Sequence, residues 1–135
     1  MKRPRDQAEA LLRKAANDLI TADAVMATGK ALDMACFHAQ QAVEKSLKAI
    51  LALHDVTYPW RHDLAELLAL AKPLAPEISA YEEDMLAMAG YAVSARYDAD
   101  FDPAAVEAAA AYDQAVAVYR VAAARVGVAA DDWLP

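Results

Sequence analysis

Glycine, proline and cysteine are scarce in this chain of 135 residues, which holds 3 Gly, 6 Pro and 1 Cys. The scarcity of glycine and proline excludes collagen-like, low-complexity and turn-rich β architectures. The single cysteine, Cys36, excludes a disulfide framework and a cysteine-rich zinc site. The length suits one domain that buries a hydrophobic core without disulfides or a structural metal.

Long hydrophobic runs are also missing, although 59% of the residues are hydrophobic. No apolar run reaches the roughly 18 to 20 residues that a membrane span needs. The first nine residues are charged and lack the apolar stretch of a signal peptide. We therefore expect a cytoplasmic protein that does not contact a membrane.

Positive charge is concentrated in the first half of the chain. Residues 1–62 carry nine Lys and Arg against seven Asp and Glu, whereas residues 63–135 carry four against thirteen, which gives the formal net charge of -7. Phosphate binding depends on cation density, so this balance disfavours RNA as a general partner. For most of these charges we expect a solvated helix surface.

Helix-forming residues dominate what is present. Alanine makes up about a quarter of the chain, and apolar residues recur at three- and four-residue steps. We predict an all-α fold, an antiparallel up-and-down bundle of four long helices plus one short helix. The expected helices cover residues 7–28, 31–54, 62–71, 77–95 and 103–126, with Asp102 as the N-cap of the last. They form a single domain over residues 1–128, followed by a short, flexible acidic tail at 129–135.

The helix expected at 31–54 carries a polar, mostly cationic face. At about 100° per residue, His38, Gln41, Lys45 and Lys48 fall within one arc of about 80°, and Cys36 lies opposite, on the apolar face. Such a face is either solvated or a site for a phosphate or nucleotide. Between the two faces lies a strip of small residues that lets another helix approach closely: Ala35, Ala39, Ala42, Ser46 and Ala49.

Two polar residues of the same helix, Gln40 and Glu44, lie at the edge of its apolar side. A buried glutamate is costly unless it is paired. The pattern therefore indicates a structural salt bridge or a dimer contact at Glu44, with a functional role as the alternative.

Four segments together resemble the HEPN domain family (higher eukaryote and prokaryote nucleotide-binding). The most specific is Phe-His-Ala-Gln-Gln-Ala-Val-Glu-Lys-Ser-Leu-Lys-Ala at residues 37–49. The others are Asn17-Asp-Leu19, His62-Asp-Leu-Ala-Glu-Leu67 and Tyr91-Ala-Val-Ser-Ala-Arg-Tyr97. The resemblance covers about residues 7–126.

This resemblance implies a helical bundle that forms a homodimer. In bacteria such proteins are commonly encoded beside a minimal nucleotidyltransferase and form a complex with it, and some pairs behave as toxin and antitoxin. It also implies nucleotide binding. The residues expected to bind the ligand or partner are His38, Gln41, Lys45, Lys48, Arg96 and Tyr97.

Many members of the family are metal-independent ribonucleases that use an Arg followed, after four to six residues, by a His. The chemistry needs a His for proton transfer and an Arg to stabilise charge on the phosphate. Here the matching arginine is Arg96, but positions 101–103 hold Phe101, Asp102 and Pro103, and no histidine follows His62. Asp98, Asp100 and Asp102 would also repel RNA phosphates. We therefore predict that the usual nuclease site is absent, and we assign no catalytic residue.

The leading hypothesis is thus a binding and assembly module. One alternative is a ribonuclease toxin with an atypical site in which Arg96 acts with His38, and another is a structural dimer without a ligand. Arg96 itself either pairs with a neighbouring aspartate at the helix end or lines a dimer cleft with Tyr97. We predict no metal site and no cofactor, because the sequence lacks His-Glu-x-x-His, Glu-x-x-His and a glycine-rich phosphate loop.

Overall fold

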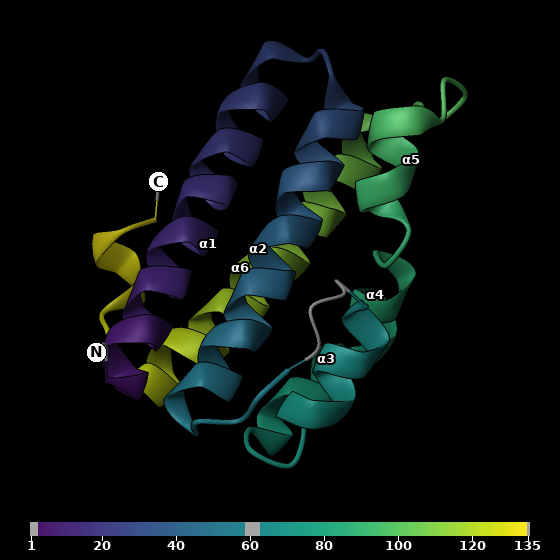
Figure 1. Cartoon of the computed structure of the whole chain (residues 1–135). Coiled ribbons are helices and arrows are strands. Elements are labelled where there is room, and N and C mark those ends of the chain that lie inside the picture. The colour runs from purple at the N-terminus through teal and green to yellow at the C-terminus, as the bar shows by residue number, and fades with distance from the viewer. Residues whose placement is uncertain (1–2, 59–62, 135) are drawn as a thin grey trace.

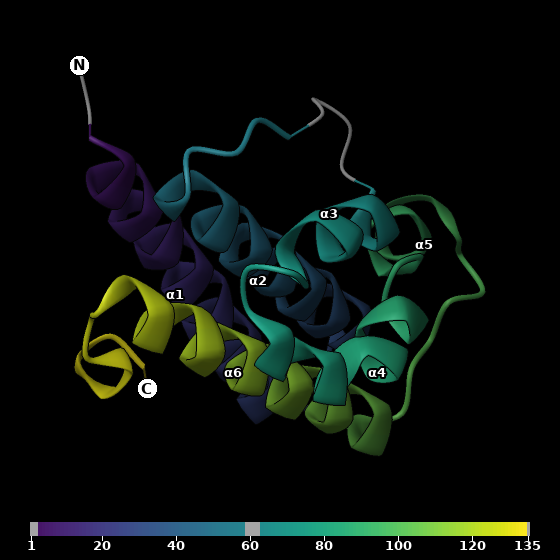
Figure 2. The same ribbon diagram turned by 90° about the horizontal axis from the view of Figure 1, so that it is seen from below.

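The chain folds into a helical bundle with four antiparallel legs (Figure 1). The computed structural model describes residues 3–58 and 63–134. The legs are α1 (Pro4–Thr28), α2 (Leu32–Leu53), a segmented third leg, and α6 (Ala105–Val126). The third leg comprises the 3₁₀ turn η1 (Pro76–Tyr81), α4 (Glu82–Ala87) and α5 (Tyr91–Tyr97). The short helix α3 (Leu64–Ala71) precedes this leg, packs against α2 and runs in the opposite direction (Figure 1 and Figure 2). The described residues contain no strand. The predicted all-α bundle is therefore confirmed.

The first two legs form a tight helical hairpin. Gly29 ends α1 in the left-handed conformation at φ 69°, and its N–H donates to the carbonyl of Met26 at 3.0 Å. Glycine is favoured there because a Cβ penalises this conformation. The helix end predicted at Thr28 is confirmed. The start lies earlier than expected, because Pro4 suits the first helical position.

Helix α2 is the centre of the molecule. It packs against α1, α3, α5 and α6, and thirteen of its 22 residues are buried. Figure 2, a view along the bundle, shows α2 surrounded by the other legs. Every member of the predicted small-residue strip is buried, which fits the close approach of neighbouring helices.

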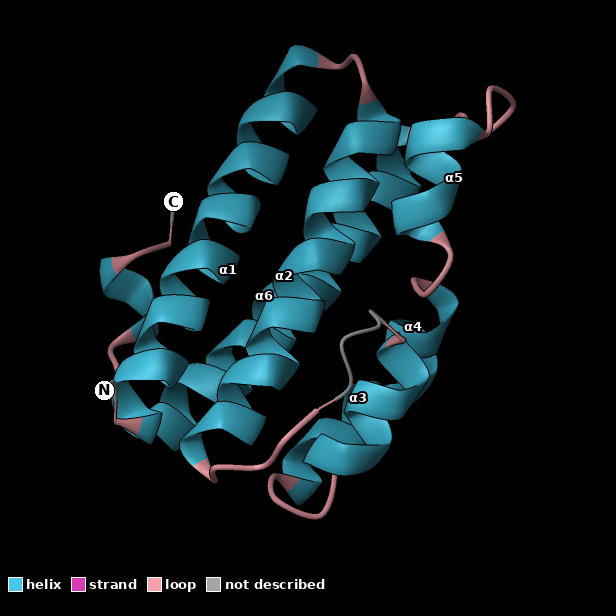
Figure 3. Ribbon diagram, in the orientation of Figure 1, coloured by secondary structure: helices cyan, strands magenta, loops and turns pink. Residues whose placement is uncertain are grey.

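The element predicted as one helix over residues 77–95 is divided into three. Residues 76–81 form the 3₁₀ turn η1, and α4 and α5 are separated by the turn at 88–90 (Figure 3). Pro76 starts the first piece, and Gly90 is the last residue before α5. Glycine disfavours a helix interior by about 1 kcal/mol relative to alanine. The bundle therefore has three long helices and a segmented leg.

Local capping explains two of the other boundaries. The Asp63 carboxylate accepts from the backbone N–H groups of Ala65 and Glu66 and so begins α3; the preceding residue His62, where that helix was expected to begin, lies outside the described residues. The expectation that Asp102 caps the last helix is wrong, because α6 begins at Ala105 with Glu107 accepting from the N–H of Ala104 at 3.2 Å.

The C-terminal segment predicted as a flexible tail follows the helix end at Gly127 and makes defined contacts. The guanidinium carbon of Arg13 on α1 lies 4.5 Å from the ring centroid of Trp133. Arg120 on α6 pairs with Asp131 at 2.7 Å. The tail thus lies along α1 and α6. In the described part of the chain, no helix is both long and apolar enough to cross a membrane.

Candidate functional site

The polar face of α2 meets α1 at one carboxylate, Asp18. The Nδ1 atom of His38 lies 2.9 Å from Asp18 Oδ1, and Lys45 Nζ donates to Asp18 Oδ2. Asp18 is 8% exposed. A carboxylate so removed from water needs a cation or hydrogen-bond donors close by. Two of the predicted ligand-binding residues are therefore partners of a buried structural anion.

A second cluster continues along the same helix. The Gln41 side-chain amide donates to Gln40 Oε1 at 2.7 Å and to Glu44 Oε2 at 3.1 Å. Lys48 Nζ lies 3.2 Å from Glu44 Oε1. Glu44 is 2% exposed, so its charge is compensated inside the protein. The structural salt bridge expected at Glu44 is present.

Each of the four residues on the predicted cationic arc therefore contacts an acidic or amide side chain of this chain. Lys48 also lies 5.6 Å from the ring centroid of Tyr58. The arrangement satisfies charges within the fold, and it leaves less positive potential for an anionic ligand than the sequence suggested.

Arg96 lies on α5 and forms no ion pair with the carboxylates expected to pair with it, Asp98, Asp100 and Asp102. Its Nε donates to the carbonyl of Ala92 at 2.7 Å, and its guanidinium carbon lies 5.3 Å from the centroid of Tyr97 and 5.7 Å from that of Phe37. Among the described residues, Arg96 has no carboxylate within ion-pair distance. The proposed pairing of Arg96 with a neighbouring aspartate is therefore not formed. Arg96 instead stabilises the last turn of α5 and stacks on aromatic rings.

Phe37 connects the two predicted regions. Its ring contacts His38 edge-on at a centroid distance of 5.1 Å and also lies under Arg96. Of the three positions at which a nuclease histidine was expected, Phe101 packs on Tyr91 at 5.5 Å and Pro103 is buried. None of positions 101–103 therefore places next to Arg96 the imidazole that the nuclease motif requires.

Cys36 lies in the core of α2, as the sequence predicted. It is fully buried, and burial, reinforced by the negative charge of Glu107, raises the pKa of its thiol to about 11. A protonated, inaccessible thiol is a poor nucleophile and a poor metal ligand. Among the described residues, no three His, Cys, Asp or Glu side chains come together as a metal site would require.

The role of Asp18 was not predicted from the sequence. The residue was noted only within the Asn17-Asp18-Leu19 segment. Its position could have indicated this role, because Asp18 lies on the buried face of α1 next to the buried Leu19. A carboxylate on an apolar stripe demands a cationic partner from the helix that it faces.

Comparisons with known proteins agree with the arrangement of helices. The family model described as HEPN domain matches residues 8–125, from the first turns of α1 to the last turn of α6. Searches of the curated proteins and of the solved structures found no match.

Proposed function

Because the chain belongs to the HEPN domain family, we propose that it is a binding and assembly module that forms a homodimer and pairs with a minimal nucleotidyltransferase. The pairing comes from the resemblance of residues 37–49 and 91–97 to the family members encoded beside such enzymes. In this role the chain supplies a contact surface, and the partner supplies the chemistry. A toxin–antitoxin system is the biological setting that the resemblance suggests.

The observation that carries this proposal is the surface of α5. This helix buries none of its residues, and it exposes Val93 at 60% and Tyr97 at 75% on either side of Arg96. Tyrosine and arginine are enriched at the centres of protein interfaces, where they bury much area at low entropic cost. We call Val93, Arg96 and Tyr97 the α5 surface and assign it to the homodimer.

Charge supports a contact between two copies of this surface. Asp98 and Asp100 follow Arg96 directly, and the Asp98 carboxylate accepts from the N–H of Asp100 at 2.9 Å. In a twofold interface each residue faces the partner's equivalent region. Arg96 of one protomer then faces the acidic loop of the other, which supplies the carboxylate that Arg96 does not reach within its own chain.

Nucleotide binding belongs to the same proposal, but the α2 face is the weaker place for it. His38 and Lys45 share Asp18, and Lys48 pairs with Glu44. Arg96 and Tyr97 offer a cation beside an aromatic ring, a pair that accepts a phosphate and a stacked base. A nucleotide would therefore bind in the cleft between two α5 surfaces, where its phosphate replaces the partner's acidic loop at Arg96.

A ribonuclease with an atypical site is the second candidate, favoured by the contact of both His38 and Arg96 with Phe37. General acid–base chemistry would use the ring nitrogen of His38 that does not contact Asp18. Two facts weigh against it: the motif histidine is missing, and the acidic loop lies next to Arg96.

The experiment is a light-scattering mass of the purified chain, alone and co-expressed with a minimal nucleotidyltransferase encoded beside it. We expect twice the mass of the chain alone and a larger stable complex after co-expression. A monomer that binds no nucleotidyltransferase would contradict the proposal. Cleavage of single-stranded RNA that is lost in both Arg96→Ala and His38→Ala would favour the second candidate.

A further inference from the structure

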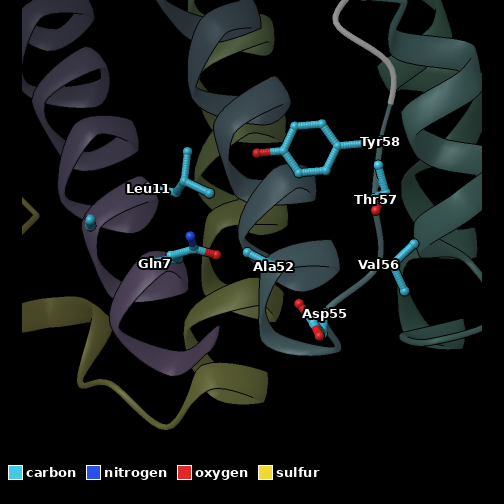
Figure 4. Close-up of a pocket in the computed structure, with 8 residues that line it drawn as sticks. Gln7, Leu11, Ala52, Asp55, Val56, Thr57 and Tyr58 are labelled. Carbon is cyan, nitrogen blue, oxygen red and sulfur yellow. The ribbon is translucent and has the colours of Figure 1, made fainter. Parts of the chain in front are cut away.

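A cavity of about 480 Å³ opens between the first turns of α1 and the end of α2 (Figure 4). Pockets for small molecules usually measure about 300 to 1,000 Å³. Ala52 in its wall lies fifteen residues along α2 from Phe37, which corresponds to about 22 Å. The cavity is thus separate from the α5 surface. Its lining comprises Gln7, Ala10, Leu11, Ala52, Asp55, Val56, Thr57 and Tyr58.

The backbone after α2 places the far wall of this cavity. Asp55 adopts the left-handed conformation at φ 55°, where Val56 N–H donates to the carbonyl of Leu51 at 2.9 Å. This is a Schellman-type helix ending with aspartate in the place where glycine is usual. Aspartate and asparagine tolerate this conformation better than other residues with a side chain. The turn sends residues 55–58 back along α2 on the side of α3, and the Tyr58 side chain extends from there towards α1 (Figure 4).

The lining is half apolar and half polar, and it carries a single charge. Ala10, Leu11 and Val56 are apolar, and Asp55 is the one charged residue among the eight. In Figure 4 the Gln7 amide and the Asp55 carboxylate lie on either side of Ala52, and the Tyr58 hydroxyl points towards α1. An ionised carboxylate only accepts hydrogen bonds, so a complementary ligand must donate them.

Within the described part of the chain, the Asp55 carboxylate has no cationic partner within ion-pair distance. The ammonium of Lys48, which lies 5.6 Å from the ring centroid of Tyr58, is paired with Glu44. A ligand that brings its own positive charge would therefore gain a charge-assisted hydrogen bond at Asp55.

We propose that this cavity binds a small organic cation, an amidinium or guanidinium group carried on a flat apolar body, with Asp55 as its anion. The apolar part lies against Leu11, Ala52 and the ring of Tyr58, and the cationic group donates to Asp55. A planar cation with two parallel N–H groups matches the two oxygens of one carboxylate. This site is independent of the proposed assembly through α5.

The test compares two isosteric probes, benzamidine and benzamide, by backbone amide shifts in NMR spectra of the full chain. Benzamidine carries the positive charge and benzamide does not. We expect benzamidine to shift the amides of Leu11, Ala52 and Thr57 saturably, with a Kd on the order of 1 mM, as suits so small a ligand. Benzamide should bind roughly tenfold more weakly or worse, because it forms no charge-assisted bond.

Two variants locate the binding. Asp55→Asn keeps a residue that tolerates the left-handed turn but removes the charge, and we expect the Kd for benzamidine to rise roughly tenfold to hundredfold. Ala10→Leu fills the cavity with Asp55 intact and should abolish the shifts. Asp23→Asn, at an exposed site elsewhere on α1, is the matched control and should bind as the wild type does.

Three outcomes would overturn the proposal. They are the absence of saturable shifts with benzamidine, equal affinity for benzamide, or unchanged binding in Asp55→Asn. Unfolding of Ala10→Leu would show in the same spectra, and Asp55→Asn then decides alone. None of these results depends on whether the chain dimerises or meets a nucleotidyltransferase.

Discussion

Helices α2 and α5 each carry a segment that resembles the family, yet they have opposite roles. Helix α2 lies in the centre of the bundle, and its polar side chains pair with Asp18 or among themselves. Helix α5 buries none of its residues and exposes an arginine between a valine and a tyrosine. A polar motif on a buried helix serves the fold, whereas apolar residues on an exposed helix are available to a partner.

The largest effect should come from removing the anion that unites α1 and α2. In Asp18→Asn, Lys45 and His38 lose the carboxylate that compensates them, and we expect the free energy of unfolding to fall by about 2 to 4 kcal/mol. Urea unfolding measures this. Asp23→Asn, an exposed carboxylate on the same helix, should stay within about 0.5 kcal/mol of the wild type. Equal stability of the two variants would show that Asp18 does not hold the hairpin.

The break between α4 and α5 can be tested with a substitution at Gly90 that favours a helical backbone. Gly90 has φ −84°, and a Cβ there would meet nothing within 4 Å. Gly90→Ala should therefore stabilise the chain by about 0.5 to 1 kcal/mol, because it lowers the entropy of the unfolded state. Gly127→Ala is the opposite case, since φ is +89° there and the substitution should destabilise by about 1 kcal/mol. A thermal melt of both variants checks the signs.

Because α5 lies on the surface, substitutions of its exposed residues should have small effects on the stability of the protomer. Tyr97→Ala should change the free energy of unfolding of the monomeric chain by no more than about 0.5 kcal/mol, because the side chain is 75% exposed. The same substitution should weaken the dimer. Unfolding at low protein concentration separates the two quantities, and a large loss of monomer stability would place Tyr97 in the fold.

The smallest effect concerns the exposed pair that joins the segmented leg to α6. Arg125 donates to Glu77 through two nitrogens, and these bonds lower the pKa of the Glu77 carboxyl below its usual 4.5. A carboxyl group whose pKa is lower in the folded than in the unfolded chain stabilises the folded state at pH values above the unfolded pKa. This contribution is lost as the pH falls through the pKa of the folded state. Glu77→Gln should thus be slightly less stable than the wild type at pH 7. The difference should vanish in strong acid and shrink in 1 M salt.

Much of the fold could be predicted because it depends on local signals. Gly29, Asp63 and Gly127 mark helix boundaries through backbone conformation or capping, which need no knowledge of the partner helix. The break at Gly90 was missed because the apolar stripe of Met85, Met88 and Ala92 continues across it. One glycine is a weak signal against such a stripe.

The candidate site was less predictable, because it depends on how helices are rotated against each other. Lys45 and Asp18 are 27 residues apart, and their contact depends on the register of α1 on α2. The periodicity of a single helix gives only the face on which a residue lies. The absence of a nuclease histidine, in contrast, could be read from positions 101–103 alone.

The central claim is that the chain assembles through α5, and the mass of one variant tests it most directly. Val93→Asp places a charge on the α5 surface. Ile20→Asp places the same charge at an exposed position of α1, where the replaced side chain is 45% exposed. Light scattering should give a dimer for the wild type and Ile20→Asp and a folded monomer for Val93→Asp. A Val93→Asp protein that remains dimeric would contradict the account.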